Sequence, residues 1–187
     1  MNLSSSVIIA AIAVVVLLLF LIRTYNRLVK LQNRVRNSWA DIDVQLSRRH
    51  DLVPNLVETV KAYMAHERGT LENVTQARTQ AMAAGGDMAA RISAEMMLSG
   101  ALGKMLVTAE NYPELQASKN MQLLQEQLSS TENRIAFARQ FYNESVLQLN
   151  TAIATFPRNL IAGILGFPPA TLFAADEGDR GNVQVKI

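Results

Sequence analysis

The chain has 187 residues, a formal net charge of +2 at pH 7 and no cysteine. The lack of cysteine excludes disulfides, thiolate nucleophiles and cysteine-ligated metals, and so small a net charge gives no indication of nucleic-acid binding. With only nine glycines and five prolines, the composition favours helices, so we expect an all-α protein. Beyond an N-terminal apolar segment there is room for one domain of about 150 residues.

The N-terminal segment is an unbroken apolar run, "VIIAAIAVVVLLLFLI", over residues 7–22. With Leu3 and the three serines it reaches about twenty residues, enough for a helix to cross a hydrocarbon core of about 30 Å. The alternative is a cleaved signal peptide, which needs a positively charged start, whereas no Lys or Arg precedes this run. We therefore expect residues 1–22 to form an uncleaved transmembrane anchor.

A basic collar follows the apolar run at once. It consists of Arg23, Arg27, Lys30, Arg34 and Arg36, and no acidic residue occurs before Asp41. Cations concentrate on the cytoplasmic side of membrane spans. The collar therefore predicts a single-pass protein whose short N-terminus lies outside and whose helical domain lies in the cytoplasm. The same side chains can also contact lipid phosphates as a solvated helix face.

Apolar residues then recur at spacings of three and four in four successive stretches, the pattern of amphipathic helices. The first stretch starts at Leu28 and predicts a helix that continues from the span to about Arg49. The second runs to Ala81 and stops before the adjacent glycines in "AAGGD", which favour a tight reversal. Asp87 is placed to cap the next helix.

The last two stretches complete the helical domain. The third helix ends at "ENYPEL", and the fourth runs from Met121 to Phe156 over five heptads before Pro157 stops it. Four such helices with short connections pack most simply as an elongated antiparallel four-helix bundle, here over residues 23–157. That topology returns residues 158–187, a short apolar segment and a polar, flexible tail, toward the bilayer. The candidate contacts with lipid or with another copy are Leu160, Ile161, Ile164, Leu165 and Phe167.

A dense polar cluster, "SRRHDLVPNL", interrupts the pattern after the first stretch. We interpret it as a turn: Arg48, Arg49 and His50 would form the last turn of one helix, Asp51 would cap the next, and Pro54 would lie in its first turn. One alternative is a charged catalytic site built on Asp41, Asp43, His50 and Asp51, but no nucleophile or metal partner accompanies the single histidine there. Another is a continuous, kinked helix in which a neighbour satisfies the carbonyl that proline frees.

The remaining polar motifs predict no catalytic, metal or cofactor site. "AHERGT" lacks the second histidine that a zinc-protease helix needs, and "GKMLVTAE" lacks the glycines of a phosphate loop. Glu67, Arg78 and Thr131 fall at or near apolar seam positions, where inward polar contacts fix the register of helices.

Two long segments carry a resemblance to a known family. The stretch "YNRLVKLQNRVRNSWADIDVQLSRRHDLVPNLVETVK" and the later "TENRIAFARQFYN" resemble the bacterial LemA family, over about residues 22 to 173. The resemblance implies a bacterial inner-membrane protein with an N-terminal anchor and a helical bundle, and a relative that takes part in forming magnetosome membranes. It brings no catalytic residues.

These observations leave three functional hypotheses. The first is a membrane-anchored scaffold that self-associates and organises or remodels the bilayer, with membrane lipids and other copies of itself as partners. The second is an adaptor or regulatory partner of a membrane protease, kinase or other envelope protein. The third, an uncharacterised hydrolase, has the least support because no set of catalytic residues is present.

Overall fold

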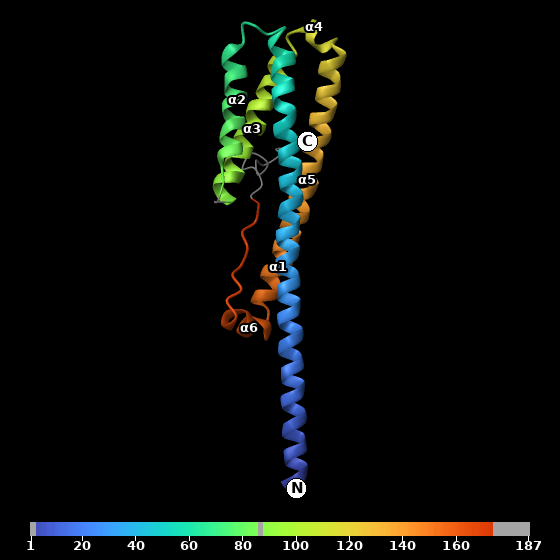
Figure 1. The fold of residues 1–187 in the computed structure, drawn as a ribbon, viewed down its shortest axis with the longest axis vertical. Helices are drawn as coiled ribbons and strands as arrows, with labels where there is room; N and C mark the ends of the chain where they lie inside the picture. The colour runs from blue at the N-terminus through green and yellow to red at the C-terminus, as the bar shows by residue number, and fades with distance from the viewer. Residues whose placement is uncertain (1–2, 86–87, 174–187) are drawn as a thin grey trace, which may run out of the picture. The chain divides into compact units, whose positions relative to one another are not determined.

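The computed structural model describes residues 3–85 and 88–173 (Figure 1). All regular secondary structure in these ranges is helical, as the sequence predicts. The helices are α1 (Leu3–Lys61), α2 (Arg68–Ala83), α3 (Met88–Ala109), α4 (Pro113–Gln116), α5 (Lys119–Ala154) and α6 (Arg158–Ile164). The chain divides into two compact units, one made of residues 1–40 and 139–172, the other of residues 41–138 and 173–187. Helices α1 and α5 contribute to both.

The N-terminal part of α1 is apolar and exposed. Every side chain over residues 7–22 is exposed to solvent, and α1 is the one helix in the described ranges that is long and apolar enough to cross a membrane. Among residues 3–85 and 88–173, nothing buries this apolar stretch. Length and composition therefore agree with the predicted anchor.

The rest of the first unit packs α1 against the C-terminal part of α5 and against α6. Leu28, Ala152 and Ala162 form a small buried cluster, which follows from the three-and-four spacing of apolar residues on α1 and α5. Higher on the same helices, Trp39 and Tyr142 meet edge to face with ring centroids 5.4 Å apart.

A strap of residues 168–172 follows α6 and is held by side chains of α5. The amide of Asn150 donates to the carbonyl of Ala170 at 2.9 Å, and the N–H of Ala170 donates back to Asn150 Oδ1 at 2.8 Å. The hydroxyl of Tyr142 donates to the carbonyl of Thr171 at 2.8 Å. The strap lies within the predicted C-terminal segment of residues 158–187, ahead of its polar tail. The predicted flexibility beyond residue 173 lies outside the described residues.

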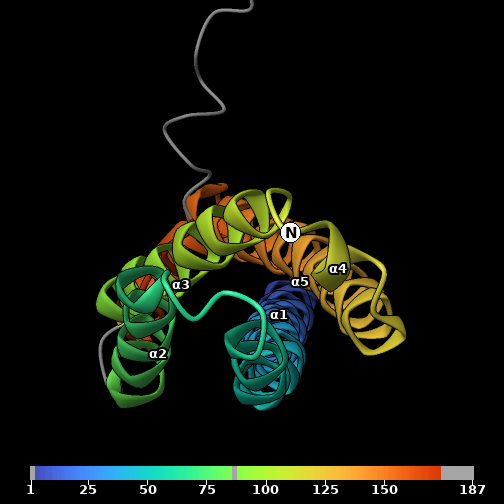
Figure 2. The same ribbon diagram turned by 90° about the horizontal axis from the view of Figure 1, so that it is seen from above.

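The second unit has a continuous apolar core to which α1, α2, α3, α4 and α5 all contribute. Figure 2 shows the ribbons of these helices from above. Its fully buried members include Leu56 and Val60 of α1, Val74 of α2, Leu98 of α3 and Leu115 of α4. Val60 and Val74 belong to the predicted stripes, whereas Leu56, Leu98 and Leu115 do not. Each helix still presents one apolar face to this core.

The predicted turn after Arg49 is wrong. Helix α1 continues through Arg48, Arg49, His50, Asp51 and Pro54 and ends at Lys61. Asp51 is exposed within this helix, so it caps nothing. The chain reverses instead between Lys61 and Arg68.

The reason is found opposite Pro54. Proline has no N–H, so in a helix it leaves the carbonyl four residues earlier, that of His50, without its usual donor. Arg78 of α2 supplies the missing donor, because its Nε–H bonds to the carbonyl oxygen of His50 at 2.8 Å. The helix therefore continues across the proline. This agrees with the alternative of a continuous helix in which a neighbouring side chain bonds to the freed carbonyl.

The other boundaries lie close to their predicted places. Helix α2 ends at Ala83, just before the glycine pair, while Gly86 and the predicted cap Asp87 lie outside the described residues. Helix α3 ends at Ala109, and Pro113 opens the four-residue α4 rather than only ending what precedes it. A further short helix, α6, follows Pro157.

Candidate functional site

A buried polar cluster lies in the second unit and is built around Arg49. The Arg49 side chain is 0% exposed. One guanidinium nitrogen, Nη1, donates to Ser99 Oγ of α3 at 2.6 Å and to Glu132 Oε1 of α5 at 2.8 Å. The other, Nη2, pairs with the Glu95 carboxylate of α3 and donates to the Glu95 carbonyl. One side chain thus joins three helices.

His50 extends the cluster on the next position of α1. Its Nε2 lies 3.0 Å from Glu95 Oε1, so Glu95 faces two cationic or donor groups of α1. Burial alone would raise the pKa of Glu95, but the hydrogen bond with His50 and the charge of Arg49 outweigh it and hold the pKa below its ordinary 4.5. Glu95 is therefore a carboxylate at neutral pH although its side chain is 1% exposed.

A second ion pair lies two turns earlier on α1. Asp43 Oδ1 is 2.8 Å from Arg91 Nη2 of α3, and both side chains are partly exposed. Burial raises the pKa of Asp43 more than the charge of Arg91 lowers it, so the net shift is upward from 3.8. The pKa values of the two acids thus shift in opposite directions: two donors of α1 face Glu95, whereas Asp43 has Arg91 and also feels the charge of Glu95.

The contacts of the cluster join helices. Ser99 Oγ accepts from Arg49, and His50 Nε2 faces Glu95 Oε1, so both groups have partners within the cluster. In the part of the chain that the structure describes, no group of three or more His, Asp or Glu side chains is arranged to hold a metal ion. A buried ion pair with this many partners fixes which helix faces meet.

Comparison of the sequence with known proteins identifies the family and several relatives. Residues 38–187 match the sequence pattern of the LemA family. The chain belongs to the LemA family. Magnetosome proteins MamQ 1 and MamQ 2 of Paramagnetospirillum magneticum are each 26% identical to it over 191 residues, covering 89% of this chain and 70% of theirs. Protein LemA of Metamycoplasma hominis is 26% identical over 158 residues, covering 84% and 72% of the two chains.

This LemA-family chain presents the whole predicted basic collar to solvent. Arg23, Arg27, Lys30, Arg34 and Arg36 are all exposed. Arg34 is also engaged within the first unit: it donates to Gln148 at 3.0 Å and lies over the ring of Phe141, 5.1 Å from its centroid. The collar thus lies on the surface, and its Arg34 is bound to α5.

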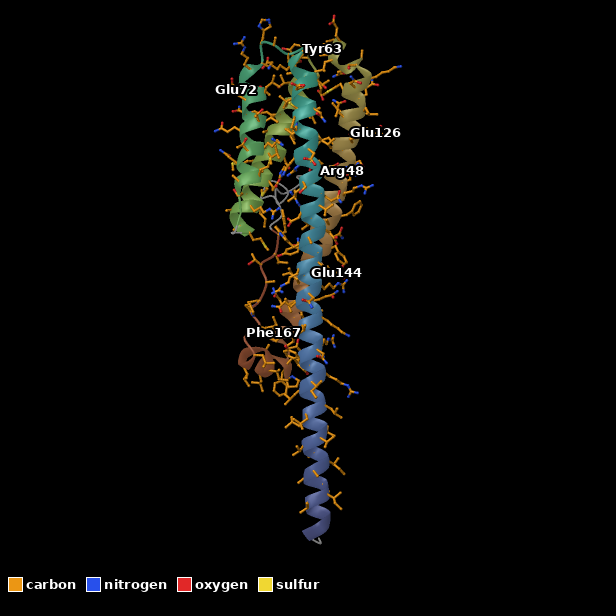
Figure 3. All side chains as sticks on the ribbon, in the orientation of Figure 1. Arg48, Tyr63, Glu72, Glu126, Glu144 and Phe167 are labelled. Carbon is orange, nitrogen blue, oxygen red and sulfur yellow. The ribbon has the colours of Figure 1, made fainter. Side chains whose placement is uncertain are left out.

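The structure separates the five predicted contact residues of the C-terminal segment into two groups. Ile161 is buried, and Phe167 packs edge to face on Tyr25 with centroids 6.1 Å apart. Figure 3 labels Phe167. The other three, Leu160, Ile164 and Leu165, are 58%, 85% and 48% exposed. Only these three form an outward apolar surface, while the first two attach α6 and its following turn to the first unit.

An apolar groove of about 440 Å³ adjoins this surface within the first unit. Its lining comes from α1 and from α6 with the residue that follows it, and consists of Leu21, Ile22, Tyr25, Ile161, Ile164 and Leu165. No charged side chain contributes to it. The groove is therefore suited to an apolar group.

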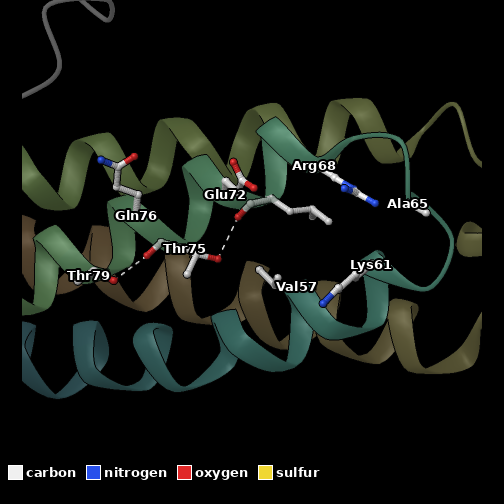
Figure 4. Close-up of a pocket in the computed structure, with 9 residues that line it drawn as sticks. Val57, Lys61, Ala65, Arg68, Glu72, Thr75, Gln76 and Thr79 are labelled. Carbon is white, nitrogen blue, oxygen red and sulfur yellow. Dashed lines mark hydrogen bonds between the residues drawn. The ribbon is translucent and has the colours of Figure 1, made fainter.

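A larger groove, of about 770 Å³, lies between α1 and α2 in the second unit (Figure 4). Val57 and Lys61 come from α1, and Arg68, Glu72 and Thr75 come from α2. The threonine hydroxyl is already bonded within α2, to the carbonyl of Leu71 at 3.0 Å. The groove combines apolar side chains with two cations from its two sides.

Sequence reasoning missed the acidic partners of Arg49. Glu95 lies within the apolar stripe of α3, between buried Ile92 and buried Leu98. A carboxylate at such a position is a usable signal, since it must find a cation once the helix packs. Arg78, in contrast, was expected to make an inward contact, and its bond to the His50 carbonyl confirms that expectation.

Proposed function

We propose that this protein is a membrane-anchored, non-enzymatic scaffold that self-associates and organises or remodels the bacterial inner membrane. The observation that carries the proposal is the exposed apolar surface of Leu160, Ile164 and Leu165. It lies beside Leu21 and Ile22, where the apolar run of α1 ends.

This surface is costly in water. Burying a Leu or Ile side chain fully gains about 1.5–3 kcal/mol, so three such side chains on a short stretch favour a covering partner. A patch that is exposed, apolar and adjacent to a membrane span is a natural contact for the bilayer or for molecules in it. The scaffold thus has two attachments near one membrane surface, the span and the segment around α6.

The proposal includes a topology and an architecture. Residues 23–157 would act as one elongated antiparallel four-helix bundle in the cytoplasm, with the N-terminus outside. Support comes from the basic collar, which places five cations directly after the span and none before it. A reporter fused to the C-terminus should function in the cytoplasm; activity only outside it would overturn this topology.

Self-association would proceed by lateral contacts between neighbouring copies. Ala10, Ala11 and Ala13 in the span allow close approach of helices in the bilayer. Contacts between unlike surfaces repeat from copy to copy and give a ring or an open array. Similarity to proteins named as magnetosome proteins supports a role in building a cellular structure.

The test is to crosslink native membranes and to image the protein extracted in mild detergent. A ladder of self-crosslinked species and regular oligomers in the images are the expected results. A monomer that crosslinks only to other proteins would refute the scaffold and leave the adaptor.

The groove between α1 and α2 favours that alternative, an adaptor for another envelope protein. Its mix of Val57 with Lys61 and Arg68 suits an amphipathic segment that carries acidic residues. Lys61→Glu with Arg68→Glu should then release a co-purifying partner. Arg48→Glu, which reverses another exposed cation, is the matched control and should retain it.

A further inference from the structure

The apolar groove of the first unit has an unusual position along α1. Leu21 and Ile22 line it, and they are the last two residues of the apolar run. Arg23, the first cation of the chain, comes next. In a helix that crosses a bilayer, such a change marks the boundary between hydrocarbon and head groups. The groove therefore opens at the level where acyl chains begin.

The apolar side chains of α6 are held at this level by the fold. Ala162 packs in the buried cluster with Leu28 of α1, and Phe167 packs on Tyr25. After the turn, the strap is fixed to α5 by the two hydrogen bonds between Asn150 and Ala170. Ile164 is thus exposed because α6 is attached through its opposite side.

The surroundings of α6 have the composition of a membrane interface. Tyr25 and Phe156 are 47% and 76% exposed, and Arg158 begins the helix. Aromatic rings and the long stems of arginine favour the head-group region, while aliphatic side chains enter the hydrocarbon. A short helix with this division of residues suits a position in the plane of the interface.

We propose that α6 is a second, in-plane membrane contact of this protein, and that the groove between α6 and Leu21 and Ile22 takes the acyl chain of a phospholipid. The ligand class follows from the lining, which is apolar apart from the hydroxyl of Tyr25 and carries no charge for a head group. The commitment to lipid over a second copy of the chain follows from the continuity of the groove with the apolar run. This inference rests on the membrane anchoring in the proposed function and does not depend on self-association.

The absence of cysteine from the sequence makes a direct test possible. Single-cysteine variants of the full chain, Ile164→Cys and Leu160→Cys, are reconstituted in phospholipid vesicles and labelled with an environment-sensitive fluorophore. Quenching is then measured with nitroxide groups on the acyl chains and, separately, with iodide in the water. Leu123→Cys on α5 is the matched control, because Leu123 and Leu160 are 56% and 58% exposed. Val14→Cys, within the apolar run, reports on the anchor itself.

The expected result is blue-shifted emission and quenching by the acyl-chain nitroxides at positions 164, 160 and 14, with iodide quenching only position 123. Quenching of positions 164 and 160 by iodide would overturn the inference and show that α6 lies in water. Protection from both quenchers, together with crosslinking between copies of the Ile164→Cys variant, would also overturn it, because a second copy would then cover α6. If position 14 is quenched by iodide, the anchor fails, and with it both the inference and the membrane anchoring on which the scaffold depends.

Discussion

Removing the guanidinium of Arg49 should cost much more stability than removing that of its neighbour. Arg49 is 0% exposed and Glu95 is 1% exposed, so Arg49→Met leaves a carboxylate in the core with His50 as its remaining close partner. Breaking a buried pair in this way typically costs about 3–5 kcal/mol. Glu132 adds little, because its side chain is 37% exposed and water can solvate it. The remaining contact with His50 places the expected loss toward about 3 kcal/mol, the lower end of that range.

The matched control is Arg48→Met, the same change one residue earlier on an exposed side chain. Substitutions at such surface positions usually stay within about 0.5 kcal/mol. The measurement is chemical denaturation of the full chain in detergent, followed by circular dichroism. A double variant, Arg49→Met with Glu95→Leu, removes both buried charges and should recover most of the loss, as replacement of buried ion pairs by apolar residues often does.

Two results would contradict this account of the cluster. Equal free energies of unfolding for the Arg49 and Arg48 variants would mean that the buried pair contributes nothing. A double variant as unstable as Arg49→Met alone would mean that the loss comes from packing of the arginine stem rather than from an unpaired carboxylate.

Three further predictions concern other groups of the fold. Because the pKa of Glu95 in the folded state lies below 4.5, its contribution to stability is present at pH values above 4.5 and is lost on further acidification. The free energy of unfolding, measured by denaturation at a series of acidic pH values, should therefore decrease more steeply with falling pH in the wild type than in Glu95→Gln. Arg78→Met should cost about 1–3 kcal/mol in denaturation by leaving a carbonyl without a donor, and much less when Pro54→Ala restores the helical N–H; equal losses in both backgrounds would refute the link. Asn150→Leu should release the strap and speed proteolytic cleavage near residue 170 without loss of helical content, whereas an unchanged cleavage rate would show that the two hydrogen bonds at Ala170 do not hold it.

Periodicity predicted the helices of this protein because it reports the apolar face that each helix must bury. The stripe that includes Ile135, Val146 and Leu149 predicted α5 closely, and each of these residues is buried. Periodicity gave a wrong boundary at about Arg49, because the continuation of α1 across Pro54 depends on a donor from α2, 28 residues away from the acceptor. No local pattern contains that bond.

The candidate site was only partly predictable for a similar reason. The charged cluster at Arg48, Arg49 and His50 was evident in the sequence, but the residue type alone does not distinguish an exposed arginine from a buried one. The distinction follows from position: Arg49 lies three residues after buried Leu46 and faces the core, whereas Arg48 faces water. The strap could not be predicted from the sequence, because Asn150 bonds to the backbone of Ala170 and not to its side chain. Such a contact leaves no pattern of side chains.

The bond between Arg78 and the carbonyl of His50 has a consequence for the order in which the chain matures. A ribosome produces α1 in full before it reaches α2, so for a time the His50 carbonyl has only water as a donor. During that interval the segment after Pro54 is free to bend away from the segment before it. The arrival of residue 78 completes the helical hydrogen bonding across the proline. The hydrogen bonding of α1, which is synthesised first, thus depends on Arg78, which is synthesised later. Completion of α1 is therefore coupled to the docking of α2.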